Sequence, residues 1–255
     1  CWEHEFTGKA LMSFMNNLQQ GGEDAVINCL ENGLSVITVD PSHVMMLELK
    51  IGDGEEAGLS FGADVRILKE ALTGYTKLNK KETQMVTMKY DDTTGKILFD
   101  FGDNNFYELR ALDKSSLMRN IPVPEIDFPI EIVLNELECR KLLLSCNKQR
   151  LVGDLIAFIA TKSEFRMETT GSSSNWVSVF DREVNITDEE KNGNMYQSQY
   201  SMAYILPILK QWKGAKEIRI EFGNNFPLKM TTKNEVGGVM VESMTFLAPR
   251  IENDN

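Results

Sequence analysis

The stretch Leu117-Met-Arg-Asn-Ile-Pro-Val-Pro-Glu-Ile-Asp-Phe-Pro129 divides this chain into two halves with similar patterns. Its three prolines exclude a helix interior or a central strand, because proline has no backbone N–H to donate. Each proline also favours an extended conformation for the residue before it. The apolar side chains of the stretch nearly alternate with polar ones, so we expect an extended connector lying along a protein surface: Ile121, Val123, Ile126 and Phe128.

The hydrophobic periodicity predicts the same order of elements on both sides of this connector. Before it we expect, in order, a strand, a helix, three strands, a helix capped by Asp64 and three strands: Trp2–Phe6, Gly8–Gln20, Ala25–Leu30, Leu34–Val39, Val44–Ile51, the helix after Asp64, Met85–Tyr90, Lys96–Phe101 and Phe106–Leu112. After it we expect Ile130–Leu134, a helix over Glu136–Lys148, Leu155–Ala160, Glu164–Thr169, Trp176–Phe180, a helix over Ser201–Trp212 interrupted or bent near Pro207, Glu217–Phe222, Leu228–Thr232 and Val239–Leu247.

This repetition predicts an α+β protein with two similar domains, each an antiparallel sheet with two helices on one face. The predicted limits are 1–116 for the first domain, 117–129 for the connector and 130–255 for the second domain. We expect a turn at Glu31–Gly33 and an acidic loop at Gly52–Gly58, because glycine is common in both. That loop lacks the lysine and helix start of a phosphate-binding loop.

The composition is that of a soluble globular protein, with 42% hydrophobic and 25% charged residues and no apolar run long enough to span a membrane. Four widely spaced cysteines and two histidines argue against a zinc site and a disulfide scaffold, and no cofactor is predicted. We expect Cys139 and Cys146 to be buried, reduced thiols on one helix face with Leu142 and Leu143. The compartment should therefore be reducing.

The net charge of −11 alone would predict repulsion from nucleic acid, but the basic residues gather on helices while the acidic residues gather in loops. A basic helix face suits the phosphate backbone of duplex DNA, whose contacts give affinity without reading sequence. The alternative is that these cations are ordinary solvated surface. No aromatic residues interleave with them, which argues against stacking of single-stranded bases. The candidate DNA-facing residues are Lys9, Arg66, Lys69, Lys77, Lys80, Arg140, Lys141, Lys148, Lys210 and Lys213.

Three segments carry a family resemblance. Val39-Asp-Pro-Ser-His-Val-Met-Met-Leu-Glu-Leu49, Phe222-Gly-Asn-Asn-Phe-Pro-Leu228 and Phe246-Leu-Ala-Pro-Arg-Ile-Glu252 resemble the archaeal and eukaryotic sliding clamps, the proliferating cell nuclear antigen (PCNA) family. The resemblance implies a pseudo-six-fold ring, commonly a trimer, whose helices line a hole around duplex DNA. It also implies a non-enzymatic processivity factor in the cytoplasm of an archaeon or the nucleus of a eukaryote. The expected partners are a clamp loader and PIP-box proteins such as DNA polymerase, ligase and flap nuclease.

The resemblance further implies two protein-binding sites. The partner-peptide pocket would comprise Val39, His43, Val44, Met46, Ile121, Val123, Pro227, Phe246, Ala248 and Pro249. The subunit interface would join two edge strands through Tyr107, Leu109, Ala111, Trp176, Val177 and Val179. The chain departs from the family at Val39, where methionine is frequent, at Phe246, where tyrosine is common in eukaryotic members, and in its weakly basic first helix.

Two alternatives stay open at the level of sequence. One is a monomeric processivity factor that binds DNA without encircling it. The other is a metal-dependent nuclease with clustered carboxylates as ligands: Asp91, Asp92, Asp100 and Asp103. Metal catalysis needs ligands that converge on one cavity, whereas acidic residues around a hairpin turn are commonplace.

Overall fold

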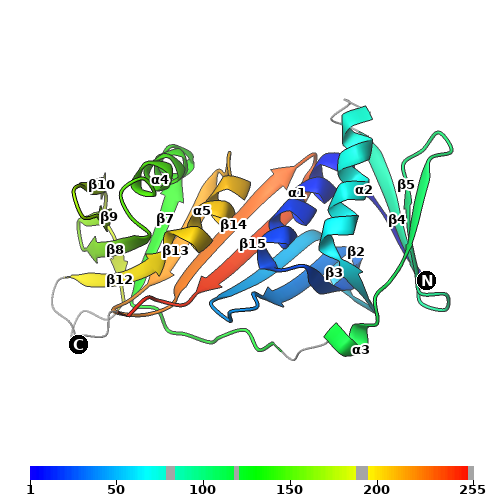
Figure 1. Cartoon of the computed structure of the whole chain (residues 1–255), viewed down its shortest axis with the longest axis horizontal. Coiled ribbons are helices and arrows are strands. Elements are labelled where there is room, and N and C mark those ends of the chain that lie inside the picture. The colour runs from blue at the N-terminus through cyan, green and yellow to red at the C-terminus, as the bar shows by residue number, and fades with distance from the viewer. Residues whose placement is uncertain (79–83, 118–120, 188–194, 252–255) are drawn as a thin grey trace. The chain divides into compact units, whose positions relative to one another are not determined.

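The computed structural model describes the chain except for residues 79–83, 118–120, 188–194 and 252–255 and the side chains of 74–78. It has the predicted α+β fold with antiparallel sheets (Figure 1). The chain forms two compact units, which are Cys1–Pro122 with Asn234–Ser243, and Val123–Lys233 with Met244–Asn255. The domain limits expected from the sequence stay a prediction.

Unit 1 contains a four-stranded antiparallel sheet in the order β1-β4-β5-β6 and a long antiparallel pair, β2 with β3. Its helices α1 and α2 contact one another and β3 (Figure 1). Its elements are β1 (Trp2–Thr7), α1 (Gly8–Leu18), a 3-10 turn (Gln19–Gly21), β2 (Asp24–Val39), β3 (Met45–Asp64), α2 (Val65–Leu78), β4 (Met85–Asp91), β5 (Lys96–Asp100), β6 (Phe106–Arg110) and α3 (Lys114–Leu117).

Unit 2 repeats this plan. Its sheets have the orders β10-β9-β8-β12 and β11-β7-β13-β14-β15, and α4 contacts α5. Its elements are β7 (Ile130–Asn135), α4 (Glu136–Gln149), β8 (Leu155–Thr161), β9 (Glu164–Thr170), β10 (Asn175–Asp181), β11 (Asn185–Ile186), β12 (Tyr196–Ser201), α5 (Met202–Gln211), β13 (Glu217–Phe222), β14 (Leu228–Val236) and β15 (Val239–Leu247). The segment 234–243 of the β14–β15 hairpin is grouped with unit 1, where Val241 joins the apolar core.

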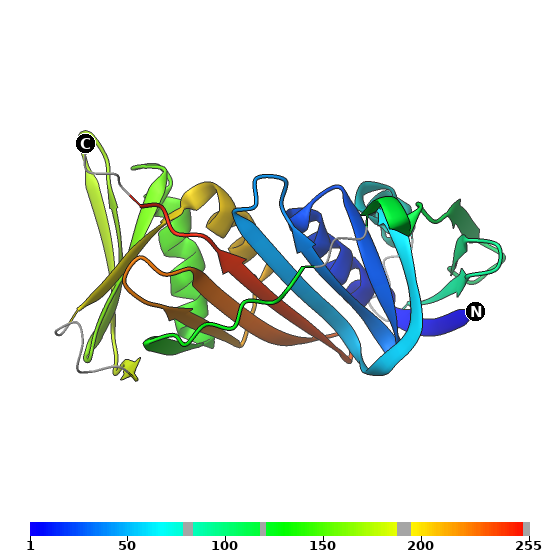
Figure 2. The ribbon, with the colours of Figure 1, turned by 90° about the horizontal axis from the view of Figure 1, so that it is seen from below.

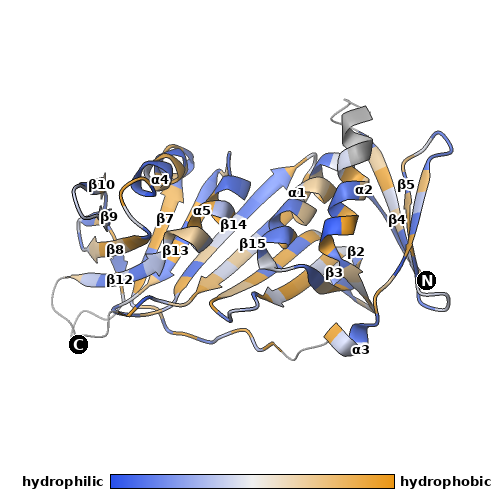
Figure 3. Cartoon of the chain, viewed as in Figure 1, coloured by the Kyte–Doolittle hydropathy of each residue, from blue (hydrophilic) through white to orange (hydrophobic). Residues whose placement is uncertain are grey.

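Apolar residues alternate along the strands and follow the inner sides of the helices (Figure 3). The periodicity that predicted α1 and α2 is confirmed, since Leu11, Phe14, Leu68 and Leu72 are fully buried. Asp64 caps α2 as expected, because its Oδ1 accepts a hydrogen bond of 3.0 Å from the backbone N–H of Ile67. Between Ile121 and Phe128 the connector forms neither helix nor strand, as its prolines predicted (Figure 2).

The turn predicted at Glu31–Gly33 and the loop predicted at Gly52–Gly58 are wrong, because both segments lie within β2 and β3. Gly33 and Gly52 are cross-strand partners, close to two register shifts in the pair. A Cβ at Gly33 would lie 1.9 Å from a backbone oxygen of β3, and Gly52 has a φ of 78°. Glycine here permits close approach in an irregular strand pair.

Three further expectations for unit 2 need correction. On α4, Leu143 is only half-buried and Gln149 takes a place in the core, although Cys139, Leu142 and Cys146 are buried as predicted. Strand β12 was missed, and it ends at Ser201, where the helix had been expected to begin. Helix α5 continues through Pro207, so the expected interruption is wrong, whereas the expected bend stays a prediction.

Candidate nucleic-acid surface and strand edges

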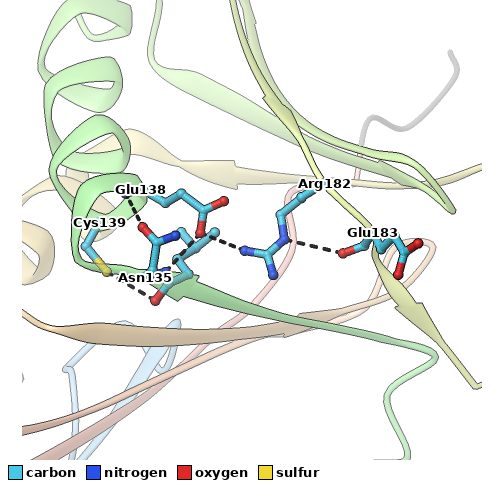
Figure 4. A network of polar contacts seen from close by, with 6 residues as sticks. Asn135, Glu138, Cys139, Arg182 and Glu183 are labelled. Carbon is cyan, nitrogen blue, oxygen red and sulfur yellow. Dashed lines mark hydrogen bonds and ion pairs between the residues drawn. The ribbon is translucent and has the colours of Figure 1, made fainter.

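Helix α4 is fixed at its start by a capping box. The side-chain oxygen of Asn135 accepts a hydrogen bond of 3.0 Å from the backbone N–H of Glu138, and Glu138 Oε2 accepts one of 2.9 Å from the backbone N–H of Asn135 (Figure 4). The same carboxylate oxygen lies 2.8 Å from Nη1 of Arg182. The ion pair offsets the charge of Glu138, so this carboxylate adds little negative field to the outer face of α4.

The candidate cations of unit 2 separate into engaged and available side chains. Lys148, Lys210 and Lys213 are exposed, and within the described part of the chain their side chains have no hydrogen bond or ion pair. By contrast, Arg140 forms an ion pair with Glu136 across one helical turn. Lys141 donates a hydrogen bond to the backbone oxygen of Val179 in β10. An anion would therefore meet Lys148, Lys210 and Lys213 first.

Glu136 draws further positive charge to the start of α4. Its Oε2 lies 2.9 Å from Nζ of Lys216, and its Oε1 lies 2.5 Å from Nη2 of Arg140. Hydrogen bonds from Lys216 and then Arg140 lower the pKa of Glu136 below its ordinary value. One carboxylate thus engages two cations, so both have a partner although the cluster keeps an excess of positive charge.

The helices of unit 1 offer fewer available cations. Lys69 Nζ donates a hydrogen bond of 2.5 Å to Oε1 of Gln19, which joins α2 to the end of α1. Arg66 lies 4.0 Å from the carboxylate of Glu70 across one turn of α2, and both side chains are exposed. Lys9 is exposed on α1. The predicted contacts of Lys77 and Lys80 lie outside the described residues and side chains.

Exposed leucines on α4 were not anticipated from the sequence. Leu137 and Leu144 are 72% and 60% exposed, and their seven-residue spacing places them on one helix face close to Lys148. Leu151, which follows the helix, is 74% exposed. The outer face of α4 is thus a mixture of apolar and basic side chains. The regular leucine spacing was the sequence signal that could have revealed it.

The predicted interface strands are both edge strands. β6 lies at one end of the order β1-β4-β5-β6, and β10 lies at one end of the order β10-β9-β8-β12. Val177 is 52% exposed, and Phe106, absent from the predicted set, is 59% exposed. Trp176 and Tyr107 are also exposed, whereas Leu109 and Ala111 pack against the core of unit 1 and Val179 is half-buried. Such unpaired edges are sites where another strand can add.

The hairpin between β9 and β10 determines which backbone groups of β10 face outward. Gly171 N–H donates a hydrogen bond of 2.8 Å to the oxygen of Ser174, which closes the hairpin. Antiparallel pairs alternate between bonded and non-bonded types. Counting along the uninterrupted register, Ser178 pairs with β9, whereas the backbone groups of Val177 and Val179 point to the free edge.

The same reasoning applies to β6. Ala111 N–H donates a hydrogen bond of 2.8 Å to the oxygen of Gly95, and the register with β5 continues without a shift. Tyr107 and Leu109 therefore occupy bonded pairs. The backbone groups of Phe106, Glu108 and Arg110 point away from β5, towards the free edge.

A buried carboxylate shapes the loop between β2 and β3. Asp40 is 6% exposed, and its side chain accepts hydrogen bonds of 3.1, 2.7 and 2.7 Å from the backbone N–H groups of Ser42, Val44 and Met45. His43, in the same loop, is exposed and has a φ of 55°. The carboxylate holds this strained loop in one conformation.

The predicted pocket residues fall into both units. In unit 1, His43 is exposed, Met46 is buried, and Val39, Val44 and Ile121 are half-buried. In unit 2, Val123 and Ala248 are exposed and Phe246 is buried, while two prolines are half-buried: Pro227 and Pro249. The pocket as a whole stays a prediction.

The carboxylates considered as metal ligands serve local turns. Asp91 accepts hydrogen bonds from the hydroxyls of Thr93 and Thr94, which lower its pKa to about 2, and Asp100 accepts one from Gly102. Within the described residues, no group of three or more histidine, cysteine, aspartate or glutamate side chains is placed to hold a metal ion.

The cysteines are reduced, and burial raises the pKa of Cys146 to about 12 and that of Cys139 to about 11, as expected for inert thiols in a core. None of the helices described here is both long and apolar enough to cross a membrane.

The chain was compared with known proteins. No family model matches it. The DNA polymerase sliding clamp of Archaeoglobus fulgidus is 24% identical over 253 residues, which cover 97% of this chain and 98% of that protein. The structure of A. fulgidus PCNA bound to the C-terminal region of FEN-1 superimposes with a TM-score of 0.80 and 24% identity over 99% of both chains. The chain is thus similar in sequence and in fold to sliding clamps (PCNA) over nearly its whole length. PCNA from Thermococcus kodakaraensis has the same TM-score at 19% identity and covers 97% of this chain. The sliding-clamp fold predicted by resemblance is confirmed along nearly the whole chain.

Proposed function

We propose that this chain is one subunit of a sliding clamp, which encircles duplex DNA and tethers DNA polymerase and other replication and repair enzymes to it. The observation that carries the proposal is the match to sliding clamps over almost the full length of both chains. The repeated helix–sheet plan and the two edge strands support the same conclusion. A protein that acts by topology needs no nucleophile or cofactor.

The proposed DNA contacts are weak and independent of sequence. Lys148, Lys210 and Lys213 are the side chains best placed to meet phosphates, because they are exposed and have no partner within the described residues. Contacts of lysine with phosphate release counterions without reading bases. Few available cations on a chain with a net charge of −11 favour a clamp that slides rather than one that stays at a site.

Ring closure is proposed to occur through the two edges. The outward backbone groups of β6 in one subunit would pair with those of β10 in the next, and a trimer is the expected ring. Such a head-to-tail contact has to close, since otherwise it would continue as a filament. Closure would also remove two edges that invite aggregation.

Partner enzymes are proposed to bind through PIP-box peptides at the pocket named above. Val123 and Ala248 supply exposed apolar surface, and Met46 has the adaptable side chain that suits several ligands. DNA polymerase, ligase and flap nuclease are the expected partners, and a clamp loader is expected to open the ring.

The decisive experiment separates encirclement from simple binding. Linear duplex DNA with free ends, and the same DNA with both ends blocked by biotin–streptavidin, is incubated with the protein at micromolar concentration and then washed at moderate salt. A ring threads over free ends only, so retention should disappear on blocked DNA. Light scattering should give the mass of a closed oligomer. A monomeric mass with equal retention on both DNAs would instead favour the monomeric processivity factor.

A charge reversal tests the DNA surface. We expect Lys210→Glu to weaken DNA binding and to reduce the slope of log K against log salt by about 0.9 for each phosphate that the protein no longer neutralises. Lys89→Glu on β4 is the matched control, since Lys89 already pairs with Glu3 at 3.0 Å. Equally weakened binding in the two variants would show that only total charge matters and would contradict the proposed surface.

A further inference from the structure

The side chain of Lys141 contacts a neighbouring strand, which its position on α4 did not predict. It lies on the exposed side of α4 with Arg140, yet its ammonium donates a hydrogen bond to the backbone oxygen of Val179. Its Nζ also lies 4.6 Å from the ring centroid of Phe180. Both contacts are with β10, the edge strand of its sheet. A lysine expected on the DNA surface is thus bound to a strand edge.

The acceptor of this hydrogen bond is one of the outward groups of β10. The register places Val179 opposite Arg166 in a non-bonded pair, so its carbonyl points away from β9. A strand that adds to this edge has to place a backbone N–H along the same direction. The Lys141 ammonium already occupies that position, in the way that lysines on edge strands commonly block unwanted pairing.

Two other side chains of α4 hold the strand in place beside this lysine. Glu138 lies 2.8 Å from Nη1 of Arg182, immediately after β10 (Figure 4). At the other end of the helix, the buried Gln149 Nε2 lies 3.3 Å from Oγ of Ser178. These contacts fix β10 relative to α4, so Lys141 is held where it can bond the Val179 carbonyl.

The other edge has no equivalent cover. Among the described residues, no side chain bonds the outward backbone groups of Phe106, Glu108 or Arg110 on β6. Lys96 Nζ reaches this strand, but it pairs with the side-chain carboxylate of Glu108 at 2.7 Å. The two edges therefore differ, one covered by a cation and one open.

We propose that Lys141 is an edge guard, meaning a side chain that covers the outward carbonyl of Val179 in the free subunit and is displaced when β6 of a second copy pairs with β10. This inference rests on the proposed ring. The guard makes an unassembled β10 a poor template for arbitrary strands, including a second β10. The open edge of β6 presents several outward backbone groups together, so its N–H groups can displace the Lys141 ammonium from the Val179 carbonyl.

The test measures assembly of the full chain by light scattering and sedimentation over a dilution series. Lys141→Met removes the ammonium but keeps an apolar stem of similar length over Phe180. Because assembly would no longer have to break one charge-assisted hydrogen bond, we expect the Kd between subunits to fall about threefold to tenfold. Lys148→Met, which removes a lysine of the same helix without contact to β10, should leave the Kd unchanged. Circular dichroism checks that both variants fold.

The outcomes separate this inference from the proposed function. A wild type that assembles, with Lys141→Met assembling equally well or less well, overturns the guard and leaves the ring intact. A wild type that is monomeric at every concentration overturns the ring. In that case the guard is still decided by whether Lys141→Met associates, and a monomeric variant overturns it too. Lys141→Gln, which retains only a neutral donor, should give a Kd between those of the wild type and Lys141→Met.

Discussion

The first helices of the two units, α1 and α4, have equivalent places in the order of elements but are held by different kinds of contact. The buried face of α1 is almost entirely apolar: Ala10, Leu11, Phe14, Met15 and Leu18. Its buried Asn17 donates a side-chain hydrogen bond of 2.8 Å to the oxygen of Ser13 in the same helix. The buried face of α4 contains Ser145 and Gln149 beside two cysteines and one leucine.

The same order of elements thus accommodates two ways of fixing a helix. Apolar packing stabilises α1 without directing it strongly, because the hydrophobic effect follows buried area rather than angle. Hydrogen bonds from Lys141 and Gln149 tie α4 to particular atoms of β10 and β9, and an ion pair ties Glu138 to Arg182, which follows β10. The directional contacts therefore occur in the unit whose edge strand carries the covered carbonyl.

Truncating a core residue of α1 tests whether apolar packing holds this helix, and it should cost more stability than any other change proposed for the two helices. Phe14 is fully buried in the core of unit 1, and Phe14→Ala should lower the free energy of unfolding by about 3–5 kcal/mol, because it removes apolar burial and leaves a cavity. Denaturant unfolding followed by circular dichroism measures the change. Phe14→Leu is the control and should cost less than half as much. A decrease below about 1 kcal/mol for Phe14→Ala would contradict apolar anchoring of α1.

Replacing Gln149 tests whether buried hydrogen bonds hold α4, and a smaller loss of stability is expected. Gln149 is fully buried, and its Oε1 accepts a hydrogen bond of 2.7 Å from Oγ1 of Thr169, while its Nε2 donates to Ser178 and to the oxygen of Met167. Gln149→Leu should lower the free energy of unfolding by about 1–3 kcal/mol, because it leaves the buried Thr169 hydroxyl without its acceptor. The same denaturant titration measures the decrease.

A double-mutant cycle sharpens this result. Adding Thr169→Val to Gln149→Leu removes the orphaned hydroxyl as well, so the double variant should be more stable than the sum of the two single effects predicts. Strict additivity would mean that the two side chains do not act together. In that case α4 would be held, like α1, by packing alone.

Much of this architecture could be predicted from the sequence because most elements have a strong apolar period. The alternation of apolar and polar residues that predicts a strand is interrupted where a polar residue is buried. In β12, Ser198 is 1% exposed and donates to the oxygen of Phe226 at 3.2 Å, so an inward position looked polar. In β2 and β3, Gly33 and Gly52 looked like turn residues because glycine serves both turns and close strand approaches.

The candidate site was harder to predict because it depends on contacts between distant residues. Helical periodicity placed Lys141 on an exposed face correctly, but the side chain turns to an acceptor 38 residues away in the chain. Arg140 is likewise basic by sequence and engaged by Glu136 in the structure. The sequence shows on which helix face a lysine or arginine lies. Whether that side chain is available to a ligand depends on the tertiary partners that it reaches.

The first turns of α4 and α1 should differ slightly in how their local opening depends on pH. The start of α4 is stabilised by Glu136, whose pKa is lowered from 4.5 by hydrogen bonds from Lys216 and Arg140, whereas α1 has no acidic residue in its first turn. A carboxyl group with a lowered pKa contributes stability above its unfolded value, and this contribution disappears as pH falls through the folded value. Hydrogen exchange should therefore show the first turn of α4 opening more readily below about pH 4.5, while the first turn of α1 changes less. Glu136→Gln should make the first turn of α4 less sensitive to pH in that window, with Glu138 as the carboxylate that remains there, and an unchanged pH profile in the variant would place the titrating group elsewhere.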